Sequence, residues 1–222
     1  MKMWRLLSGG WGFWVRMLAL LWFLIVAGLV ISRLSQRTCS KRLFPHRDDL
    51  ESSAQEAGLV LDVLQLRYWL CYGSLWGQLH ERRNPAWESD VELCVLREQA
   101  TDDRQDSLVT QLEAAGFTAE LDARRGLLDV YRSDGTPGLV QLIFFAPDSV
   151  NKMYRRDGWL HRSLGADCTA EPELHCFPAR LVAAPLKRRA FGHYEMPVPW
   201  VGFELQKYLY PDSWYRDYAP SC

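Results

Sequence analysis

An uncharged apolar run from Met17 to Ser32 divides this chain into two parts that must fold in different ways. Residues 11–15 extend the run beyond Arg16 to about 22 residues in all, and a helix across a bilayer core needs roughly 20. The sequence therefore predicts an N-terminal tail at 1–10, a transmembrane signal-anchor at 11–32 and a stem at 33–47. A cleaved signal peptide is the alternative, but its apolar core is usually about 7–15 residues long, which favours the anchor.

The remaining residues, 48–222, are expected to form one folded domain. The chain has 222 residues, of which 48% are hydrophobic, and that is enough to bury a sizeable core. Its net charge is -1, and its sequence lacks a basic stripe interleaved with aromatic side chains. Nucleic acid is therefore not an expected partner.

The chain contains six cysteines. Cys71 and Cys94 lie in apolar, strand-like runs, and we expect both to be small buried hydrophobic side chains. Cys168 and Cys176 flank a short loop. A disulfide or two free thiols is favoured there over a zinc site with His175, because the spacing matches no paired-ligand pattern.

Apolar periodicity predicts an α+β domain built on one mixed sheet with flanking helices. Helices are expected at 49–66, 74–80, 103–115 and 200–209, and strands at 68–72, 89–96, 117–121, 127–132 and 139–145. Asp48 or Asp49 is expected to cap the first of these helices. After residue 146, prolines break the pattern into short pieces, and only the last helix is clear.

The strand expected at 89–96 carries the strongest chemical signal. Asp90 and Glu92 alternate with apolar residues, so both lie on one face of that strand. Two such carboxylates suit Mg²⁺ or Mn²⁺, because a hard cation takes oxygen ligands and completes its shell with water and substrate phosphates. Upstream, a Gly73-Ser74 turn leads into a short helix whose free N–H groups can bind a phosphate. The sequence thus predicts a site for a metal-bound phosphate.

The segment from Tyr72 to Leu93, YGSLWGQLHERRNPAWESDVEL, resembles the signature of the LicD and fukutin-related family. Residues 177–214 resemble the family's closing segment, in which a proline-rich stretch precedes a leucine-rich helix. The resemblance implies a nucleotidyltransferase fold and an enzyme that moves phosphocholine or a sugar-alcohol phosphate from a CDP-linked donor to a glycan. It also implies a single-span Golgi protein with its domain in the lumen.

Within that resemblance, Asp90 and Glu92 are the metal-binding and catalytic carboxylates, although the family usually has Asp at the second position. Gly73 and Ser74 hold a phosphate of the donor. Glu88 matches a further acidic position, close to the metal or behind its ligands, with a solvated acid at the rim as the alternative.

The basic stretch of the family is matched by His80, Arg82 and Arg83. Two interpretations stay open for these residues. They clamp a phosphate of the donor, for which a bidentate arginine is well suited, or they are a solvated helix end.

One departure bears on catalysis. The family commonly has a third acid on a later strand, where this chain has Gln141, and glutamine can bind substrate or metal but cannot act as a base. Asp129, on the neighbouring expected strand, can take the role of catalytic acid or base. A solvent-facing acid on a hairpin is the alternative interpretation, and the strand register decides between them.

Two functions follow from this pattern. The first is a metal-dependent transferase of the kind described above, with a glycan or glycoprotein acceptor. The alternative is a catalytically inactive member that binds a glycan or a partner glycosyltransferase. The basic stem favours a cytosolic domain, whereas the resemblance implies a lumenal one. We follow the resemblance and expect a single-pass type II protein of the Golgi or endoplasmic reticulum.

Overall fold

The computed structural model describes residues 8–39, 46–99, 102–148, 152–164, 168 and 175–215. Its contacts divide the chain into two units, Met1–Leu43 with Ala219–Cys222, and Phe44–Tyr218. The described part of the first unit is one helix, α1 (Ser8–Cys39). None of the described helices combines the length and the apolar character that crossing a membrane requires. The anchor at 11–32 therefore stays a prediction.

The second unit begins with helices and strands in the order that the periodicity predicts. They are α2 (Arg47–Val63), β1 (Tyr68–Leu70), α3 (Tyr72–Glu81), β2 (Asp90–Leu96), α4 (Asp102–Ala114), β3 (Phe117–Asp122), β4 (Leu127–Arg132) and β5 (Leu139–Asp148). The remaining elements are β6 (Met153–Arg156), α5 (Trp159–Arg162), β7 (Phe177–Pro178), the 3₁₀ helix η2 (Ala179–Val182), β8 (Lys187–Phe191), β9 (Tyr194–Val198) and α6 (Gly202–Leu209). The predicted α+β class is confirmed.

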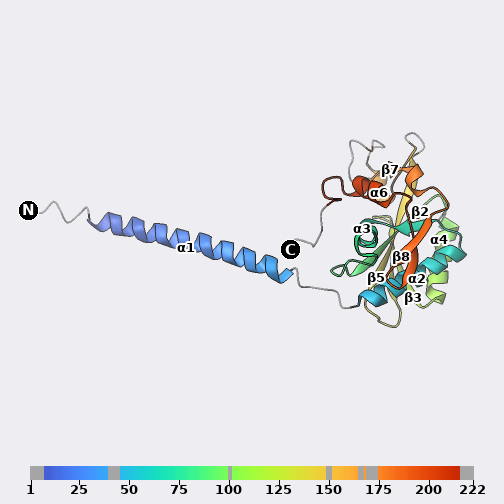
Figure 1. The fold of residues 1–222 in the computed structure, drawn as a ribbon, viewed down its shortest axis with the longest axis horizontal. Helices are drawn as coiled ribbons and strands as arrows, with labels where there is room; N and C mark the ends of the chain where they lie inside the picture. Colours follow the sequence, from blue (N-terminus) through green and yellow to red (C-terminus); the bar gives the residue numbers. More distant parts are fainter. Residues whose placement is uncertain are drawn as a thin grey trace, which may run out of the picture. The chain divides into compact units, whose positions relative to one another are not determined.

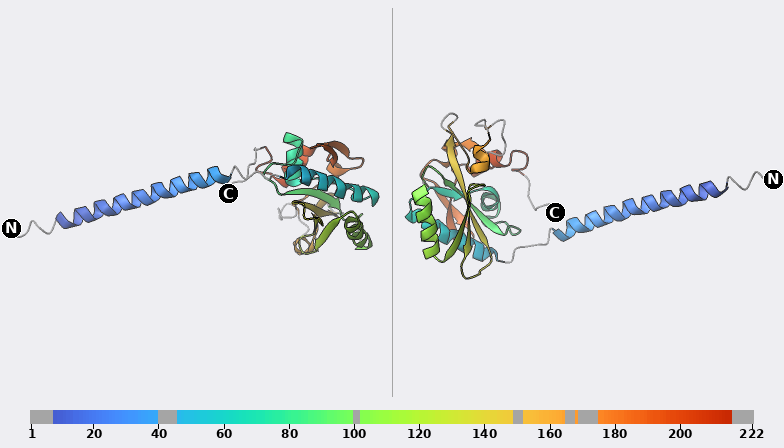
Figure 2. Two further views of the ribbon diagram at one scale, coloured as in Figure 1. Left: turned by 90° about the horizontal axis from the view of Figure 1, so that it is seen from below. Right: turned by 180° about the vertical axis from the view of Figure 1, so that it is seen from behind.

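A seven-stranded sheet forms the centre of this unit. Its strands run in the order β1-β2-β5-β4-β3, and β6 pairs with β5 and β7. β2 and β5 are parallel, and the other pairs are antiparallel. α2 and α4 pack against the sheet, and α6 lies beside α3 and β7 (Figures 1 and 2). The predicted mixed sheet with flanking helices is therefore observed.

The strand register gathers polar residues from three neighbouring strands. Glu92 lies opposite Gln141 on the β2–β5 ladder, and Gln141 lies opposite Asp129 on the β5–β4 ladder. Paired residues share a face of the sheet because side chains alternate between faces. Asp90 lies two residues before Glu92 and shares that face as well. The sheet thus brings four of the predicted site residues to one surface.

Helix α2 covers part of the sheet with the apolar side that its spacing predicts. Leu50, Ala54, Ala57 and Leu61 are fully buried. The N-cap is His46, and the predicted caps Asp48 and Asp49 lie inside the first turn, where acidic side chains still interact favourably with the helix dipole.

The β8–β9 hairpin departs from the expectation of short irregular pieces. Its strands pair from Lys187 with Val198 to Phe191 with Tyr194, around a turn in which Gly192 has φ +61°. Basic residues on β8 and Pro197 on β9 obscured the alternation by which strands are recognised.

Cys71 and Cys94 form a disulfide, so the prediction that they are unbonded hydrophobic side chains is wrong. β1 and β2 are antiparallel neighbours with Trp69 opposite Cys94. This pairing brings Cys71, just beyond β1, to a Cα–Cα distance of 5.8 Å from Cys94, inside the usual range for a disulfide. Sequence spacing alone does not reveal such a pairing.

The second disulfide joins Cys168 and Cys176, one of the two arrangements favoured by the sequence. His175, considered above as a zinc ligand, is instead hydrogen-bonded through Nδ1 to the hydroxyl of Tyr72 at 2.6 Å.

Candidate active site

The first turn of α3 lies against the first residues of β2. α3 starts at Tyr72, which has φ +46°, so Gly73 and Ser74 belong to the helix and not to a turn before it. Cys71, in extended conformation, is the N-cap. The carbonyl of Tyr72 accepts a hydrogen bond of 2.8 Å from Nε2 of Gln206 on α6. The start of α3 is thus held by α6.

Two backbone N–H groups join α3 to Glu92. The N–H of Gly73 donates to Oε2 of Glu92 at 2.7 Å, and the N–H of Glu92 donates to Oγ of Ser74 at 2.9 Å. The N–H of Gly73, expected to be free for a phosphate, therefore binds a carboxylate. Ser74 is buried, with 1% of its surface exposed. Both residues thus hold Glu92 in place.

Three neighbouring carboxyl groups, two of them beside Gly73, have raised pKa values. Burial, followed by the charge of Asp90, raises the pKa of Glu92 to about 8. Burial is also the main cause of the raised pKa of Asp90, and the charge of Asp129 is the second. The pKa of Glu88 is raised mainly by burial and then by the charge of Asp90. A Cβ on Gly73 would lie 3.3 Å from both Glu88 Oε1 and Glu92 Oε2. Acidic side chains are therefore gathered next to the start of α3, in surroundings that oppose their ionisation.

A bound cation would stabilise the ionised forms of these three carboxyl groups. Mutual repulsion and loss of water both oppose ionisation here, and a bound cation would relieve both. No set of three or more His, Cys, Asp or Glu side chains in the described part of the chain is arranged to hold a metal. Mg²⁺ commonly uses one or two carboxylates and completes its shell with phosphate oxygens and water. Asp90 and Glu92 can supply the carboxylates, and a bound nucleotide can supply the phosphate oxygens.

Asp129 faces this cluster from β4. Its side chain is 15% exposed, and its charge is one of the causes of the raised pKa of Asp90. Nε2 of Gln141 donates to its Oδ1 at 2.8 Å, and an Nη of Arg125 lies 3.7 Å from its Oδ2. Of the two interpretations from the sequence, the structure places Asp129 with the cluster, oriented by Gln141.

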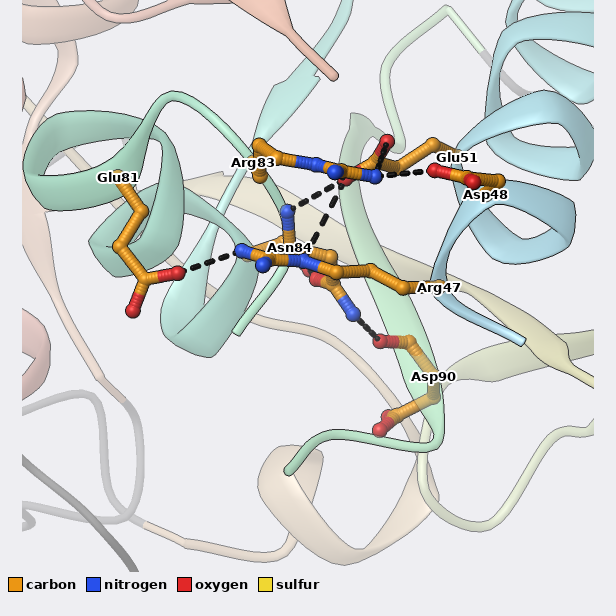
Figure 3. Close-up of polar contacts among 8 residues, drawn as sticks. Arg47, Asp48, Glu51, Glu81, Arg83, Asn84 and Asp90 are labelled. Atoms are coloured by element: carbon orange, nitrogen blue, oxygen red, sulfur yellow. Dashed lines mark hydrogen bonds and ion pairs between the residues drawn. The ribbon is translucent and has the colours of Figure 1, made fainter. Parts of the chain in front are cut away.

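Arg82 and Arg83 lie at the other end of α3. The N–H of Arg82 donates to the carbonyl of Gln78 at 3.2 Å, and that of Arg83 donates to the carbonyl of Gly77 at 3.4 Å, so both backbones lie against the C-terminal half of α3. Arg83 donates Nε and Nη2 to Glu51 at 3.1 and 2.9 Å and also bonds Asp48 (Figure 3). Arg82 is exposed, with φ +58° at the C-cap of α3. The structure does not bring the two arginines to the acidic cluster of Glu88, Asp90 and Glu92.

An aromatic cavity of about 130 Å³ opens beside Gly73 and Glu88. Its lining also includes Trp76, Pro85, Trp87, Tyr210, Ser213 and Trp214. The rings of Trp76 and Trp87 lie 5.7 Å apart, and that of Trp76 stacks on His80 at 4.3 Å. The wall of this cavity thus combines aromatic side chains from α3, from the loop after it and from the segment after α6.

Two buried residues of the site, Glu51 and Asn84, had no signal in the sequence. Each is 0% exposed. Asn84 accepts a hydrogen bond from Ser74. It also donates to the carbonyl of Asp90, and its own N–H donates to Glu51 (Figure 3). Asn84 lies in a loop without periodicity, and Glu51 looks like any polar residue of an amphipathic helix.

Comparison with known protein families gives a match over most of the second unit. The family described as LicD/FKTN/FKRP, nucleotidyltransferase domain, matches residues 65–200, a stretch that contains α3, β2 and the strands of Asp129 and Gln141. No curated protein matches the chain at a significant level.

Proposed function

Since the chain belongs to the LicD/FKTN/FKRP nucleotidyltransferase family, we propose that it is a transferase. It moves a phospho-substituent, either phosphocholine or a sugar-alcohol phosphate, from a CDP-linked donor to a glycan. The observation that carries this proposal is the cluster of Glu88, Asp90 and Glu92, in which Glu88 and Glu92 lie beside Gly73 in the first turn of α3.

In this proposal Asp90 and Glu92 hold a divalent cation, Mg²⁺ or Mn²⁺. When bound, the cation neutralises charge on the donor's pyrophosphate as the bond to CMP breaks. Gly73 orients the Glu92 carboxylate through its N–H, and Ser74 fixes the backbone of the same residue. These contacts hold the Glu92 carboxylate in place before the donor arrives, which is how a preorganised site lowers a barrier.

Asp129 takes the proton of the attacking acceptor hydroxyl. Support comes from its place on the same face as Asp90 and from the N–H that Gln141 donates to it. Gln141 then replaces the third acid of the family by orienting a base on the next strand. The aromatic cavity beside Glu88 offers the donor's base a surface for stacking.

We place this domain in the lumen of the Golgi or endoplasmic reticulum, anchored by residues 11–32. Support comes from the two disulfides, because such bonds persist in oxidising compartments and are rare in the cytosol. The inactive alternative, a glycan-binding or glycosyltransferase-binding member, is favoured by one observation, the Gln141 at the position of an acid.

The test is nucleotide binding by the full-length chain. We expect CDP to raise the melting temperature when Mn²⁺ is present and not in EDTA, because a ligand that binds only the folded state stabilises it. Asp90→Ala should abolish the shift, whereas Glu113→Ala, which removes an exposed acid on α4, should keep it. Absence of a CDP shift in the wild-type protein, with or without Mn²⁺, would refute the proposal.

A further inference from the structure

We infer that Asn84, held by Glu51, is a positioning residue that sets the distance between the first turn of α3 and the start of β2. The inference rests on the proposed function, because that distance fixes where Glu92 and Asp90 present their carboxylates.

Asn84 joins the two elements through its side chain. Its Oδ1 accepts a hydrogen bond of 3.0 Å from Oγ of Ser74, and its Nδ2 donates to the carbonyl of Asp90 at 2.9 Å. One amide group therefore contacts both α3 and β2. α3 holds the Glu92 carboxylate, and β2 carries Glu92 in its chain. Because an amide has both a donor and an acceptor end, few other side chains can replace it here.

The hydrogen bonds of Asn84 close a ring with those of Ser74. The hydroxyl of Ser74 donates to Asn84 and accepts the N–H of Glu92 at 2.9 Å. The strand then leads back from Glu92 to Asp90, whose carbonyl accepts from Asn84. Each member of this ring limits the movement of the next, so loss of Asn84 would release Ser74 and the start of β2 together.

Glu51 fixes the backbone of Asn84 from α2. Its Oε1 accepts the N–H of Asn84 at 3.1 Å, and its two oxygens also accept Nε and Nη2 of Arg83 (Figure 3). A fully buried carboxylate needs such partners, because an uncompensated buried charge is strongly destabilising. Arg83 thus makes it possible for Glu51 to hold Asn84 inside the protein.

The packing around this contact leaves little free space. A Cβ on Gly77 would lie 2.6 Å from Cδ of Pro85, and a Cβ on Gly192 would overlap the Glu51 carboxylate. Glycine on α3 therefore lets the loop after Asn84 lie directly on the helix. Glycine in the β8–β9 turn leaves room for Glu51.

The experiment combines two readouts on the full-length chain. Mn²⁺ affinity is measured from the electron paramagnetic resonance signal of free Mn²⁺, and local order is measured by amide hydrogen exchange of residues 72–76 and 88–93. We expect Asn84→Ala to weaken Mn²⁺ binding about 10–100-fold, as loss of a residue that orients a metal ligand usually does. Exchange in those two segments should rise at least about tenfold, because their opening becomes easier.

The matched control is Tyr154→Phe, which removes a side-chain hydrogen bond of 2.9 Å to Glu98 on another part of the sheet. It should leave Mn²⁺ affinity and the exchange of both segments unchanged. If Asn84→Ala does not fold, Glu51→Gln replaces it, keeping the side-chain volume while removing the charge that Arg83 binds, and the same two effects are expected.

The outcomes separate the two proposals. Faster exchange confined to both segments of the variant supports the positioning role, even if the wild-type protein binds no Mn²⁺. Absence of Mn²⁺ binding by the wild-type protein would instead count against the proposed function. Wild-type Mn²⁺ affinity and unchanged exchange in a folded Asn84→Ala protein would show that Asn84 positions neither α3 nor β2, and would overturn the inference.

Discussion

Glu92 is subject to two opposing influences at the scale of a single side chain. The N–H of Gly73 stabilises its charged form, whereas burial and the charge of Asp90 favour the neutral form and prevail, so its pKa rises to about 8. Without a cation, the folded protein therefore holds a proton there that the unfolded chain releases at a lower pH. The ionised form that binds a metal is costly until the metal is present.

The pH dependence of stability follows from this. Between the unfolded pKa near 4.5 and the folded pKa of about 8, the folded state binds more protons at Glu92, so stability falls as pH rises. In EDTA, we expect the stability of Glu92→Gln relative to wild type to increase across that window by up to about 1.4 kcal/mol per pH unit. Urea unfolding at a series of pH values measures the difference.

Glu113→Gln serves as the control for that series, since it changes an exposed acid on α4. Its stability relative to wild type should stay constant from pH 5 to 8. A Glu92→Gln curve parallel to that of the wild type would contradict the pKa assigned to Glu92.

The sequence predicted some of these side chains and not others, for a physical reason. Asp90 and Glu92 alternate with apolar neighbours, and alternation reports which face of a strand a residue occupies. Glu51 and Asn84 are defined only by partners distant in sequence, so no local pattern marks them. Arg83 was expected near a phosphate because of its motif, yet in the folded chain its side chain binds Asp48 and Glu51 on α2.

At the scale of elements, the site depends on how closely α3, the following loop and β2 fit together. Predicted helices and strands up to β5 are close to those observed, because each has a clear apolar period. The close contact of the loop after α3 with Gly77 depends on tertiary packing, which the spacing of apolar residues does not reveal. The same is true of the pairing of β8 with β9.

Gly77→Ala tests this fit. Alanine is the better helix former by about 1 kcal/mol, but its Cβ would lie 2.6 Å from Cδ and 2.9 Å from N of Pro85. We expect a net loss of about 1–3 kcal/mol in unfolding free energy, as overpacking usually causes, together with weaker Mn²⁺ binding. Chemical denaturation and the Mn²⁺ titration measure the two effects.

Thr110→Ala is the control for helix propensity, because Thr110 is an exposed position of α4. That change should stabilise the protein slightly. A Gly77→Ala protein that is also stabilised would show that the loop can move away from α3 without cost.

At the scale of the whole molecule, a covalent bond joins the strand before α3 to the strand after it. Cys71 and Cys94 are 23 residues apart in sequence, and Cys168 and Cys176 are 8 apart. The first bridge encloses α3 and the start of β2, which together carry most of the candidate site.

Removal of each bridge should therefore have a different effect. Cys71→Ala/Cys94→Ala should lower the unfolding free energy by about 3 kcal/mol, because a disulfide restricts the unfolded chain more when its loop is longer. Cys168→Ala/Cys176→Ala should cost less. Guanidinium unfolding of the two double variants measures the difference, and equal losses would argue against loop length as the cause.

The parallel pairing of β2 with β5 has a consequence for biosynthesis. All of α4, β3 and β4 lie between these two strands in the sequence, so Glu92 meets Gln141 only after that whole segment has been made and placed. Non-local pairing of this kind is slow compared with local contacts. The edge of β2 that will receive β5 therefore stays unpaired in the nascent chain until the ribosome has made the middle of the domain.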